Sequence, residues 1–246
     1  MRSSFIWLVP VLLLLNGNAR ACEPPEVMAG KVASVRDGRT LSLASGREVR
    51  LAGIETTGQS KQALESLVLG AELSLRSEHS ADVSADRYGR LIAYAYRGGD
   101  MIQKMVLESG NAVVSARIPG KGCAEILFAA ERLARNAQRG VWAQSNAVLN
   151  ASDRALLLTA KGHFAVAEGE VVSVNEAGAT TYVNFARRWS AGLTLTILRR
   201  NQRLFSRAGI VPKQLVGKRI RVRGVVEQRN GPVIEAETPE QIELVN

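Results

Sequence analysis

An arginine, a carboxylate and a hydroxyl lie close together in one short stretch of the sequence, REVRLAGIETTGQ (residues 47–59). Arg50 falls in an alternating apolar and polar run that predicts a strand, and Gly53 ends this strand before a polar loop with Glu55 and Thr56. Arginine binds phosphate oxygens through a planar fork of donors, and carboxylates ligate hard divalent cations. The stretch therefore predicts either a site for a phosphate and a metal ion or a plain surface ion pair between Arg50 and Glu55.

Two other short motifs place charged residues beside predicted turns. The motif DRYGR (residues 86–90) precedes an alternating run, so we expect Asp86 to cap a turn, Tyr88 to pack on it and Arg90 to begin a strand. The motif DGRT (residues 37–40) also has an arginine directly after a turn. Whether these arginines meet Arg50 depends on the elements that carry them.

Short strands separated by turns are predicted between residues 27 and 96. The alternating runs cover residues 31–43, 46–54, 71–78 and 89–99, and the first of them contains a D-G turn typical of a hairpin. Apolar residues at helical spacing predict helices over residues 60–70, 101–112 and 123–142, with a glycine near each C-terminal end. This order of elements is typical of a five-stranded OB-like barrel with added helices.

A second unit, predicted over residues 162–246, also consists mainly of strands. Its strand segments cover residues 168–185, 193–200, 218–236 and 240–245, with a helix over residues 201–209. We expect a second small OB-like β-barrel here, so the predicted fold class is mainly β with appended helices (α+β). The first unit covers residues 22–145, and residues 146–161 are expected as a linker that includes a helical turn.

The first 21 residues have the pattern of a signal peptide. Arg2 is followed by an apolar run of eleven residues from Phe5 to Leu15, and Ala19-Arg20-Ala21 forms an A-x-A cleavage site. The run is too short to span a bilayer, and no later stretch reaches the length that a membrane helix needs. We therefore expect an exported protein, periplasmic or secreted. A buried N-terminal helix and a lipid anchor on Cys22 are the alternatives.

The chain has two cysteines, Cys22 and Cys123. Two cysteines in an exported chain predict one disulfide between them, and a pair of free thiols is the alternative. Neither cysteine has the spacing of a metal ligand, and both histidines lie far from them in the sequence, so no zinc site is expected.

Basic residues outnumber acidic ones, with a formal net charge of +9, and they concentrate in the second unit. Such a charge suits nucleic acid first, and anionic lipid or cell-wall polymer second, although a solvated cationic face needs no ligand. Tyr182, Phe185 and Trp189 near these cations would either stack on bases or fill the core. The predicted basic face comprises Arg187, Arg188, Lys218, Arg219, Arg221 and Arg223.

Five segments resemble, in order and spacing, the staphylococcal nuclease (thermonuclease-like) family over about residues 27–143. They are DGRTLSL, VRLAGIETTG, DRYGRLIAYAY, MVLESGNAVV and AERLARNAQRGVW. The resemblance implies a five-stranded OB-type barrel and calcium-dependent hydrolysis of the phosphodiesters of DNA and RNA. The second unit looks like an accessory OB-type module found in some exported bacterial proteins of this kind.

The resemblance also implies roles for single residues. Arg50 and Arg90 match the family's two phosphate-binding arginines, and Tyr88 matches the neighbouring tyrosine. Glu55 and Thr56 match the motif that holds a metal ligand, with glutamate in place of aspartate.

Two positions depart from the family pattern. Arg39 stands where the family's first metal-binding acid lies, and Gly58 stands where the glutamate credited as general base lies. A cation fills the electrostatic role of a metal ion but does not activate water as an inner-sphere Lewis acid.

Three functions remain open on the sequence. The favoured one is binding of nucleic acid or another phosphate-bearing anion through Arg39, Arg50 and Arg90, without efficient catalysis and without a cofactor. The second is a working calcium-dependent phosphodiesterase whose remodelled site uses Asp37 or Glu55 as metal ligand and Gln59 or Glu48 as base. The third is a structural envelope module that binds protein. No oligomeric state follows from the sequence.

Overall fold

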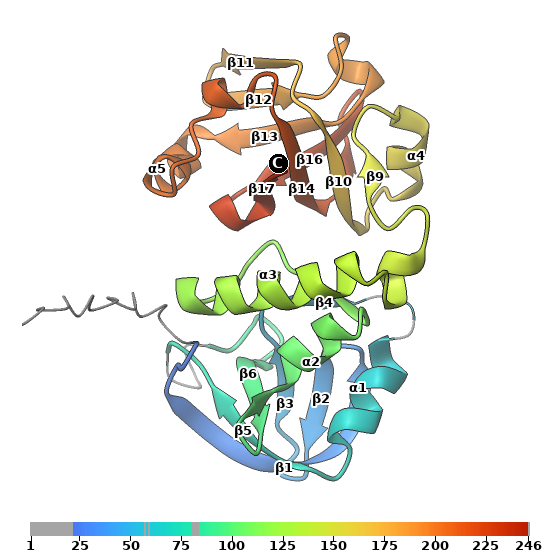
Figure 1. Ribbon diagram of the computed structural model, residues 1–246. Coiled ribbons are helices and arrows are strands. Elements are labelled where there is room, and N and C mark those ends of the chain that lie inside the picture. Colours follow the sequence, from blue (N-terminus) through green and yellow to red (C-terminus); the bar gives the residue numbers. More distant parts are fainter. Residues whose placement is uncertain (1–21, 57, 59, 80–83, 246) are drawn as a thin grey trace, which may run out of the picture.

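The computed structural model describes residues 22–56, 58, 60–79 and 84–245. The predicted signal peptide, Thr57 and Gln59 lie outside these ranges. Figure 1 shows two halves joined end to end, with one long helix, α3, between them. None of the helices in the described part of the chain is long and apolar enough to cross a membrane.

Five strands of the first half close into a barrel. They are β1 (Glu26–Asp37), β2 (Thr40–Leu43), β3 (Glu48–Leu51), β5 (Glu72–Arg76) and β6 (Leu91–Arg97). The first three form an antiparallel meander, β5 pairs with β1 and with β6, and β6 pairs in parallel with β3. Because each strand pairs on both edges, the predicted five-stranded OB-like barrel is confirmed.

The remaining elements of the first half cover one end and one side of this barrel (Figure 1). They are β4 (Ile54–Thr56), β7 (Asp100–Met101), β8 (Ala112–Val114), α1 (Ser60–Val68), α2 (Ile102–Glu108), α3 (Lys121–Asn136) and the 3-10 turn Gly140–Ala143. The three predicted helices are confirmed, and their apolar faces join the barrel residues in one core.

One glycine permits the close contact between the ends of two of these elements. Gly110 ends α2 with φ +73°, and a Cβ built on it would lie 2.1 Å from the carbonyl oxygen of Arg139. Only glycine combines this conformation with so close an approach. The C-terminal end of α2 is thereby held against the 3-10 turn that follows α3.

The second half consists of two sheets. One contains β9 (Leu149–Asn150), β10 (Phe164–Glu170), β14 (Arg219–Val225) and β17 (Ile242–Leu244), and the other β11 (Ser173–Ala177), β12 (Thr180–Asn184), β13 (Thr194–Leu198), β15 (Glu227–Gln228) and β16 (Pro232–Ala236). The helices are α4 (Arg154–Thr159) and α5 (Arg199–Arg207), with 3-10 turns at Trp189–Ala191, Pro212–Leu215 and Pro239–Gln241.

The pairing in the second half repeats that of the first barrel. A meander, β11–β12–β13, is followed by a parallel pair, β13–β16, and the strand that leads into the meander, β10, pairs antiparallel with β14. No strand ladder in the described residues joins the two sheets. The order agrees with an OB-like arrangement, and closure into a second barrel stays a prediction.

The segment expected as a linker, residues 146–161, is instead part of the second half. Its strand β9 pairs with β10, and Leu149 and Leu157 are buried in the second core. This corrects the expectation of a plain connection, because the apolar side chains of the segment have a sheet to pack against. The helix predicted inside it is confirmed as α4.

The two halves are held together by a buried ion pair. Glu131 of α3 accepts hydrogen bonds at 3.0 and 3.1 Å from the guanidinium of Arg223 on β14, and both side chains are fully buried. Arg223 also donates to the carbonyl oxygen of Val114, and the backbone N–H of Val114 donates to Glu131. Each buried charge therefore faces an opposite charge and a backbone group, although the Nε–H of Arg223 has no partner among the described residues.

Further ion pairs surround this contact. Glu243 of β17 binds Arg135 of α3 at 2.9 Å and Arg221 of β14 at 2.9 Å. Burial raises the pKa of the Glu243 carboxyl, but the surrounding arginines outweigh burial and hold it below its ordinary value. At the edge of the interface, Arg117 pairs with Glu237.

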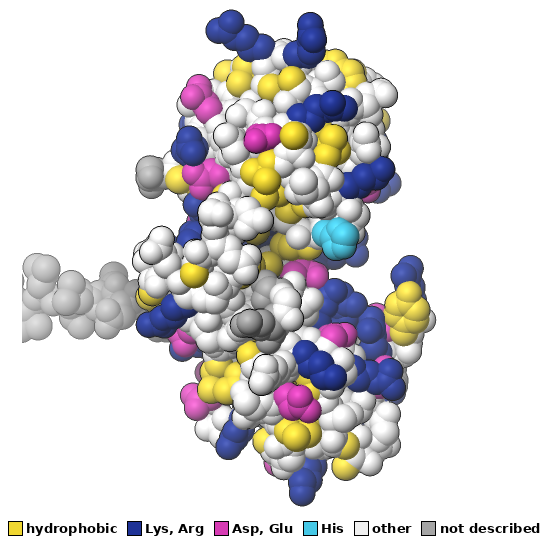
Figure 2. All heavy atoms as spheres, turned by 90° about the vertical axis from the view of Figure 1, so that its right-hand side faces the viewer, with side chains coloured by type: hydrophobic (Ala, Val, Ile, Leu, Met, Phe, Trp, Pro, Cys, Tyr) yellow, Lys and Arg dark blue, Asp and Glu magenta, His cyan; other side chains and the backbone are white. Residues whose placement is uncertain are grey.

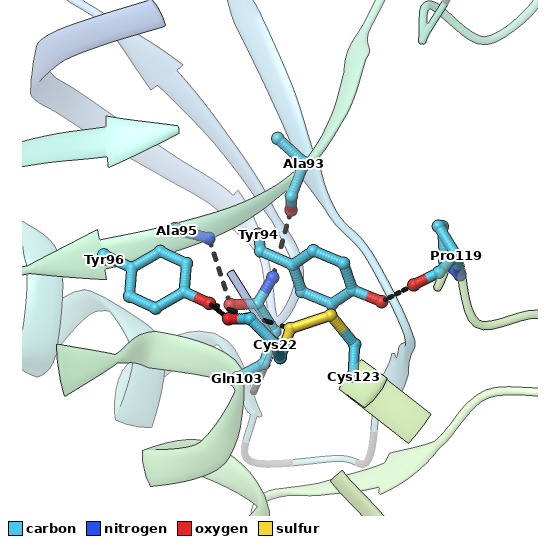
Figure 3. Close-up of a disulfide and its surroundings, with 8 residues drawn as sticks. All are labelled: Cys22, Ala93, Tyr94, Ala95, Tyr96, Gln103, Pro119 and Cys123. Atoms are coloured by element: carbon cyan, nitrogen blue, oxygen red, sulfur yellow. Dashed lines mark hydrogen bonds between the residues drawn. A yellow bond between two sulfur atoms is a disulfide. The ribbon is translucent and has the colours of Figure 1, made fainter. Parts of the chain in front are cut away.

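A disulfide fixes the start of the described chain to α3 (Figure 3). It joins Cys22 to Cys123, which confirms the predicted pairing. The hydroxyl of Tyr96 donates to the carbonyl oxygen of Cys22 at 2.7 Å, and that of Tyr94 to the carbonyl oxygen of Pro119 at 2.5 Å. The disulfide is compatible with an exported protein.

Candidate phosphate-binding site

The strand pairing of the barrel brings the three predicted arginines to one edge. Arg50 lies opposite Thr40 on β2 and opposite Ile92 on β6. Arg39 directly precedes Thr40, and Arg90 lies two residues before Ile92. Because paired residues of neighbouring strands are about 5 Å apart, Arg39 and Arg90 flank Arg50 on its two sides.

Arg39 forms an ion pair with Glu55. One terminal nitrogen of its guanidinium contacts the Glu55 carboxylate and also donates to the carbonyl oxygen of Ile54 at 3.3 Å. The turn that carries Arg39 packs tightly, since a Cβ on Gly38 would lie 2.1 Å from the Cβ of Ser60. Arg39, which stands where the family pattern has a metal-binding acid, therefore places a positive charge against the carboxylate of Glu55.

The carboxylate of Glu55 has partners on both oxygens. Oε2 contacts Arg39, and Oε1 accepts a hydrogen bond from Ser115 at 3.2 Å. No group of three or more His, Cys, Asp or Glu that would hold a metal ion occurs within the described ranges. A divalent cation at Glu55 would therefore have to displace Arg39 or Ser115 from the carboxylate. Thr56, predicted with Glu55 as a metal-site residue, is exposed on β4.

Arg90 is held by a turn of its own motif. Its Nε and Nη2 donate to Oδ2 of Asp86 at 2.8 and 2.7 Å, and Oδ1 accepts from the backbone N–H groups of Tyr88 and Arg90. Burial raises the pKa of Asp86, but these hydrogen bonds outweigh it and lower the pKa below its usual range. The turn predicted from DRYGR is present, and it orients Arg90.

The ring of Tyr88 lies between cations rather than against the barrel. It is 66% exposed, with the guanidinium groups of Arg87 and Arg90 at 4.8 and 5.1 Å from its centroid. Its hydroxyl accepts a hydrogen bond from Arg87 at 2.7 Å. The ring therefore supports the position of Arg90, and the expectation that Tyr88 packs on the turn is replaced by cation–π contacts.

Arg50 differs from its two neighbours, because its guanidinium has no hydrogen-bond or ion-pair partner among the described residues. The side chain is half-buried, and the pKa of Arg50 is lowered by this burial and by the positive charges of Arg39 and Arg90. Glu55 and Asp86 only partly offset this effect. A half-buried cation that lies between two other cations and lacks a partner among the described residues is an arrangement that binding of an anion would stabilise.

Arg50 faces a cleft between the two halves with a volume of about 820 Å³. On the side of the first half, Arg50, Glu55, Ser115 and Arg117 line it together with apolar residues. Phe164, Val225 and several glutamates of the second half form the opposite wall. Figure 2 shows Lys and Arg side chains gathered on the first half beside the hollow between the halves.

The candidates for a general base are engaged elsewhere or lie outside the described residues. Gly58 has no side chain, and Gln59 is not described. Glu48 forms an ion pair with Arg36 at 2.7 Å. Asp37, predicted as an alternative metal ligand rather than a base, accepts the backbone N–H of Arg39 at 2.8 Å.

The predicted basic face of the second half is not one face. Arg221 and Arg223 are 8% and 0% exposed and bind glutamates at the interface, so their inclusion is corrected. Lys218 and Arg219 are exposed at the start of β14, and Arg219 binds Glu168 at 2.7 Å. Arg187 and Arg188 are exposed in the loop that follows β12.

Ser115 and Arg117, which line the cleft, were not predicted. Both follow β8, whose pairing with β4 brings Ser115 beside Glu55, and Arg117 lines the same cleft. In the sequence they are more than fifty residues from Arg50, and no motif singles them out.

The first half is thus an OB-like barrel that carries three arginines on one edge. The family sequence model described as staphylococcal nuclease homologue matches residues 48–144. The chain is also 26% identical, over 132 residues, to an uncharacterized protein of Bacillus anthracis. That alignment covers 48% of this chain and 62% of the Bacillus protein.

Proposed function

We propose that the protein binds a phosphate group of a single-stranded nucleic acid in the cleft between the halves, without efficient hydrolysis. The observation that carries the proposal is the guanidinium of Arg50, which has no partner in the part of the chain that the structure describes, is flanked by Arg39 and Arg90, and faces the cleft. A phosphate there would accept the hydrogen bonds that Arg50 lacks among the described residues. Hydrogen bonds to charged groups contribute about 1.5–3 kcal/mol each.

Three features argue against efficient hydrolysis. Arg39 holds Glu55 in an ion pair, Ser115 occupies the second oxygen of that carboxylate, and Gly58 replaces the expected base. Water activation needs a base within hydrogen-bond reach or a metal that lowers the pKa of water. The clamp for phosphate is thus retained, while the groups that would activate water are replaced.

The second half favours a single strand over a duplex. Phe164 and Val225 stand across the cleft from Arg50, so a ligand must enter between two walls. A single strand is flexible and presents one phosphate at a time, whereas duplex DNA is stiff over about 150 base pairs. We also propose export, which the pattern of residues 1–21 and the disulfide support.

Binding of a labelled oligonucleotide tests the proposal. Residues 22–246 are titrated into a fluorescein-labelled single-stranded DNA of about ten nucleotides in the presence of EDTA, and anisotropy is measured. We expect Arg50→Ala to weaken binding by roughly 10- to 150-fold, and Arg50→Lys to have an intermediate effect because it keeps the charge but loses the fork.

Arg97→Ala is the matched control. Arg97 is an exposed arginine of the same barrel that does not line the cleft, so its loss changes the net charge equally. Arg50→Ala removes an unpaired cation and leaves thermal stability unchanged or higher. Equal affinity of Arg50→Ala and Arg97→Ala for the DNA would contradict the proposal.

A further inference from the structure

A second hollow lies on the outer face of the second half. The strands β11, β12 and β13 alternate, so that Val174, Val183 and Leu195 point into the core. The residues between them share the opposite face. Strand pairing places Ser173, Asn184 and Thr194 in one row, and Asn175 and Tyr182 in the next.

These polar side chains form a connected floor. Asn184 donates to the hydroxyl of Ser173 at 3.2 Å and accepts from the hydroxyl of Thr194 at 3.1 Å. Asn175 donates to the same Ser173 hydroxyl at 3.4 Å. These hydrogen bonds hold the polar side chains of the floor in fixed positions.

Two rings and a cation border this floor. The chain between β12 and β13 carries Arg187 and Trp189, which line a hollow of about 320 Å³ together with Tyr182 and the floor. Trp189 is 50% exposed. Its ring therefore leaves apolar area in contact with water, and such exposed area is typical of binding sites. Arg187 is exposed and has no ion-pair partner in the part of the chain that the structure describes.

We propose that this face is a second binding site, for the bases of single-stranded nucleic acid. Trp189 and Tyr182 stack on bases, Arg187 binds a backbone phosphate, and Asn175 reaches a base edge. A groove that combines aromatic rings with positive charge is the arrangement by which proteins bind single strands. The hollow shares no lining residue with the cleft at Arg50, so separate variants test the two sites.

Charge favours nucleic acid over a neutral sugar, which would also stack on rings. Residues 146–246 contain 14 Lys and Arg against 9 Asp and Glu. No carboxylate lines this hollow, and Arg188 lies between Arg187 and Trp189. Phe185, the third ring of the segment, is buried in the core and takes no part.

Fluorescence of Trp189 tests the site in the full mature chain. Trp142→Phe leaves Trp189 as the one tryptophan of residues 22–246, and it removes a buried indole N–H that lacks a partner in the described structure. We expect an oligothymidylate of about ten nucleotides to quench Trp189 in this background. Trp189→Ala, measured by anisotropy in the Arg50→Ala background, should weaken residual binding by roughly 5- to 150-fold.

Charge controls separate the site from general attraction. Arg187→Ala should weaken the quenching, whereas Arg203→Ala, which removes an exposed arginine of α5 outside the hollow, should not. Quenching by a neutral oligosaccharide but not by oligothymidylate would overturn the assignment to nucleic acid. Equal effects of Arg187→Ala and Arg203→Ala would overturn the site.

The same titration distinguishes this proposal from that for Arg50. Binding that depends on Arg50 while Trp189 stays unquenched would overturn the second site and leave the first standing. Quenching of Trp189 together with oligonucleotide binding that Arg50→Ala leaves unchanged would support the second site alone.

Discussion

The ion pair between Arg39 and Glu55 determines the electrostatics of the cleft edge. Both side chains are about one-fifth exposed, at 20% and 19%. Opposite charges about 4 Å apart attract by roughly 4 kcal/mol at an effective dielectric constant of 20. The positive charge at position 39 therefore takes over the neutralisation of Glu55, and a divalent cation would have to displace it.

Replacing Arg39 by Asp tests this substitution of charge. Arg39→Asp removes the guanidinium, frees one oxygen of Glu55 and adds a second carboxylate. We expect calcium to strengthen oligonucleotide binding by Arg39→Asp and to leave binding by the unsubstituted chain unchanged, as measured by anisotropy with calcium and with EDTA.

Arg39→Ala is the control, since it removes the cation without adding a ligand. Its affinity for the oligonucleotide should fall regardless of calcium. If Arg39→Asp and Arg39→Ala respond to calcium identically, the carboxylate at position 39 is not sufficient to restore metal binding, and this part of the account is wrong.

At the scale of the elements, the contact between the end of α2 and the turn after α3 fixes the helix beside the barrel. Gly110→Ala would place a Cβ 2.1 Å from the Arg139 carbonyl oxygen at a φ of +73°. We expect it to lower the free energy of unfolding by about 2–4 kcal/mol, because the backbone must move as well as adopt a strained conformation. Urea unfolding measures the change.

Gly70→Ala is the matched comparison. Gly70 has nearly the same φ, +74°, but a Cβ there meets no atom within 4 Å. Its substitution should therefore cost only the conformational strain, about 1–2 kcal/mol. A Gly110→Ala chain no less stable than Gly70→Ala would show that the close backbone contact is not needed.

The elements were predictable because their signals are local. The D-G turn, the alternation of β3 and the stripe of α3 each involve neighbours in sequence, and the structure confirms them. The segment KRIRVRG shows the limit of such signals. Alternation predicts correctly that Arg221 and Arg223 share a face, but it carries no information on what covers that face.

The candidate site likewise contains residues that local motifs predict and residues that they do not. Arg50 and Arg90 were predictable from motifs, and strand pairing brings them together. Ser115, which binds the second carboxylate oxygen of Glu55, was not predictable, because the pairing of β4 with β8 is a long-range contact. The sequence alone does not distinguish Arg39 and Arg90, which have ion-pair partners, from Arg50, which has none among the described residues.

At the scale of the whole molecule, the buried pair of Glu131 and Arg223 joins the halves that form the cleft. Glu131→Leu leaves a buried charge on Arg223, and we expect it to destabilise the protein by about 3–5 kcal/mol in urea unfolding. The double variant Glu131→Leu, Arg223→Met should recover much of this loss, because it removes both buried charges.

Recovery should remain incomplete in that double variant. The backbone N–H of Val114 loses Glu131 as acceptor, which costs about 1–3 kcal/mol. Additive effects of the two single substitutions would show that the charges do not interact across the interface.

The carboxylates around this pair predict acid sensitivity of the interface. Glu243 and Glu168 have pKa values below the ordinary 4.5, because neighbouring arginines outweigh the effect of burial. A lowered folded-state pKa means that this stabilisation is complete above about pH 4.5 and is lost as the pH falls through the folded value. Unfolding midpoints should therefore fall below that pH.

Glu243→Gln identifies the group responsible. The variant should be less stable near neutral pH, where Glu243 is charged and paired with Arg135 and Arg221, and its stability should change less on acidification. An unaltered slope of stability against pH below about pH 4.5 would assign the acid sensitivity to other carboxylates.

The most direct test of the central claim follows binding and cleavage in one sample. Residues 22–246 are incubated with labelled single-stranded DNA and calcium, and the DNA is examined by anisotropy and by gel. The account predicts salt-sensitive binding that depends on Arg50, with the DNA intact. Calcium-dependent shortening of the DNA that is lost in both Arg50→Ala and Arg90→Ala would contradict it, because the site would then still catalyse hydrolysis.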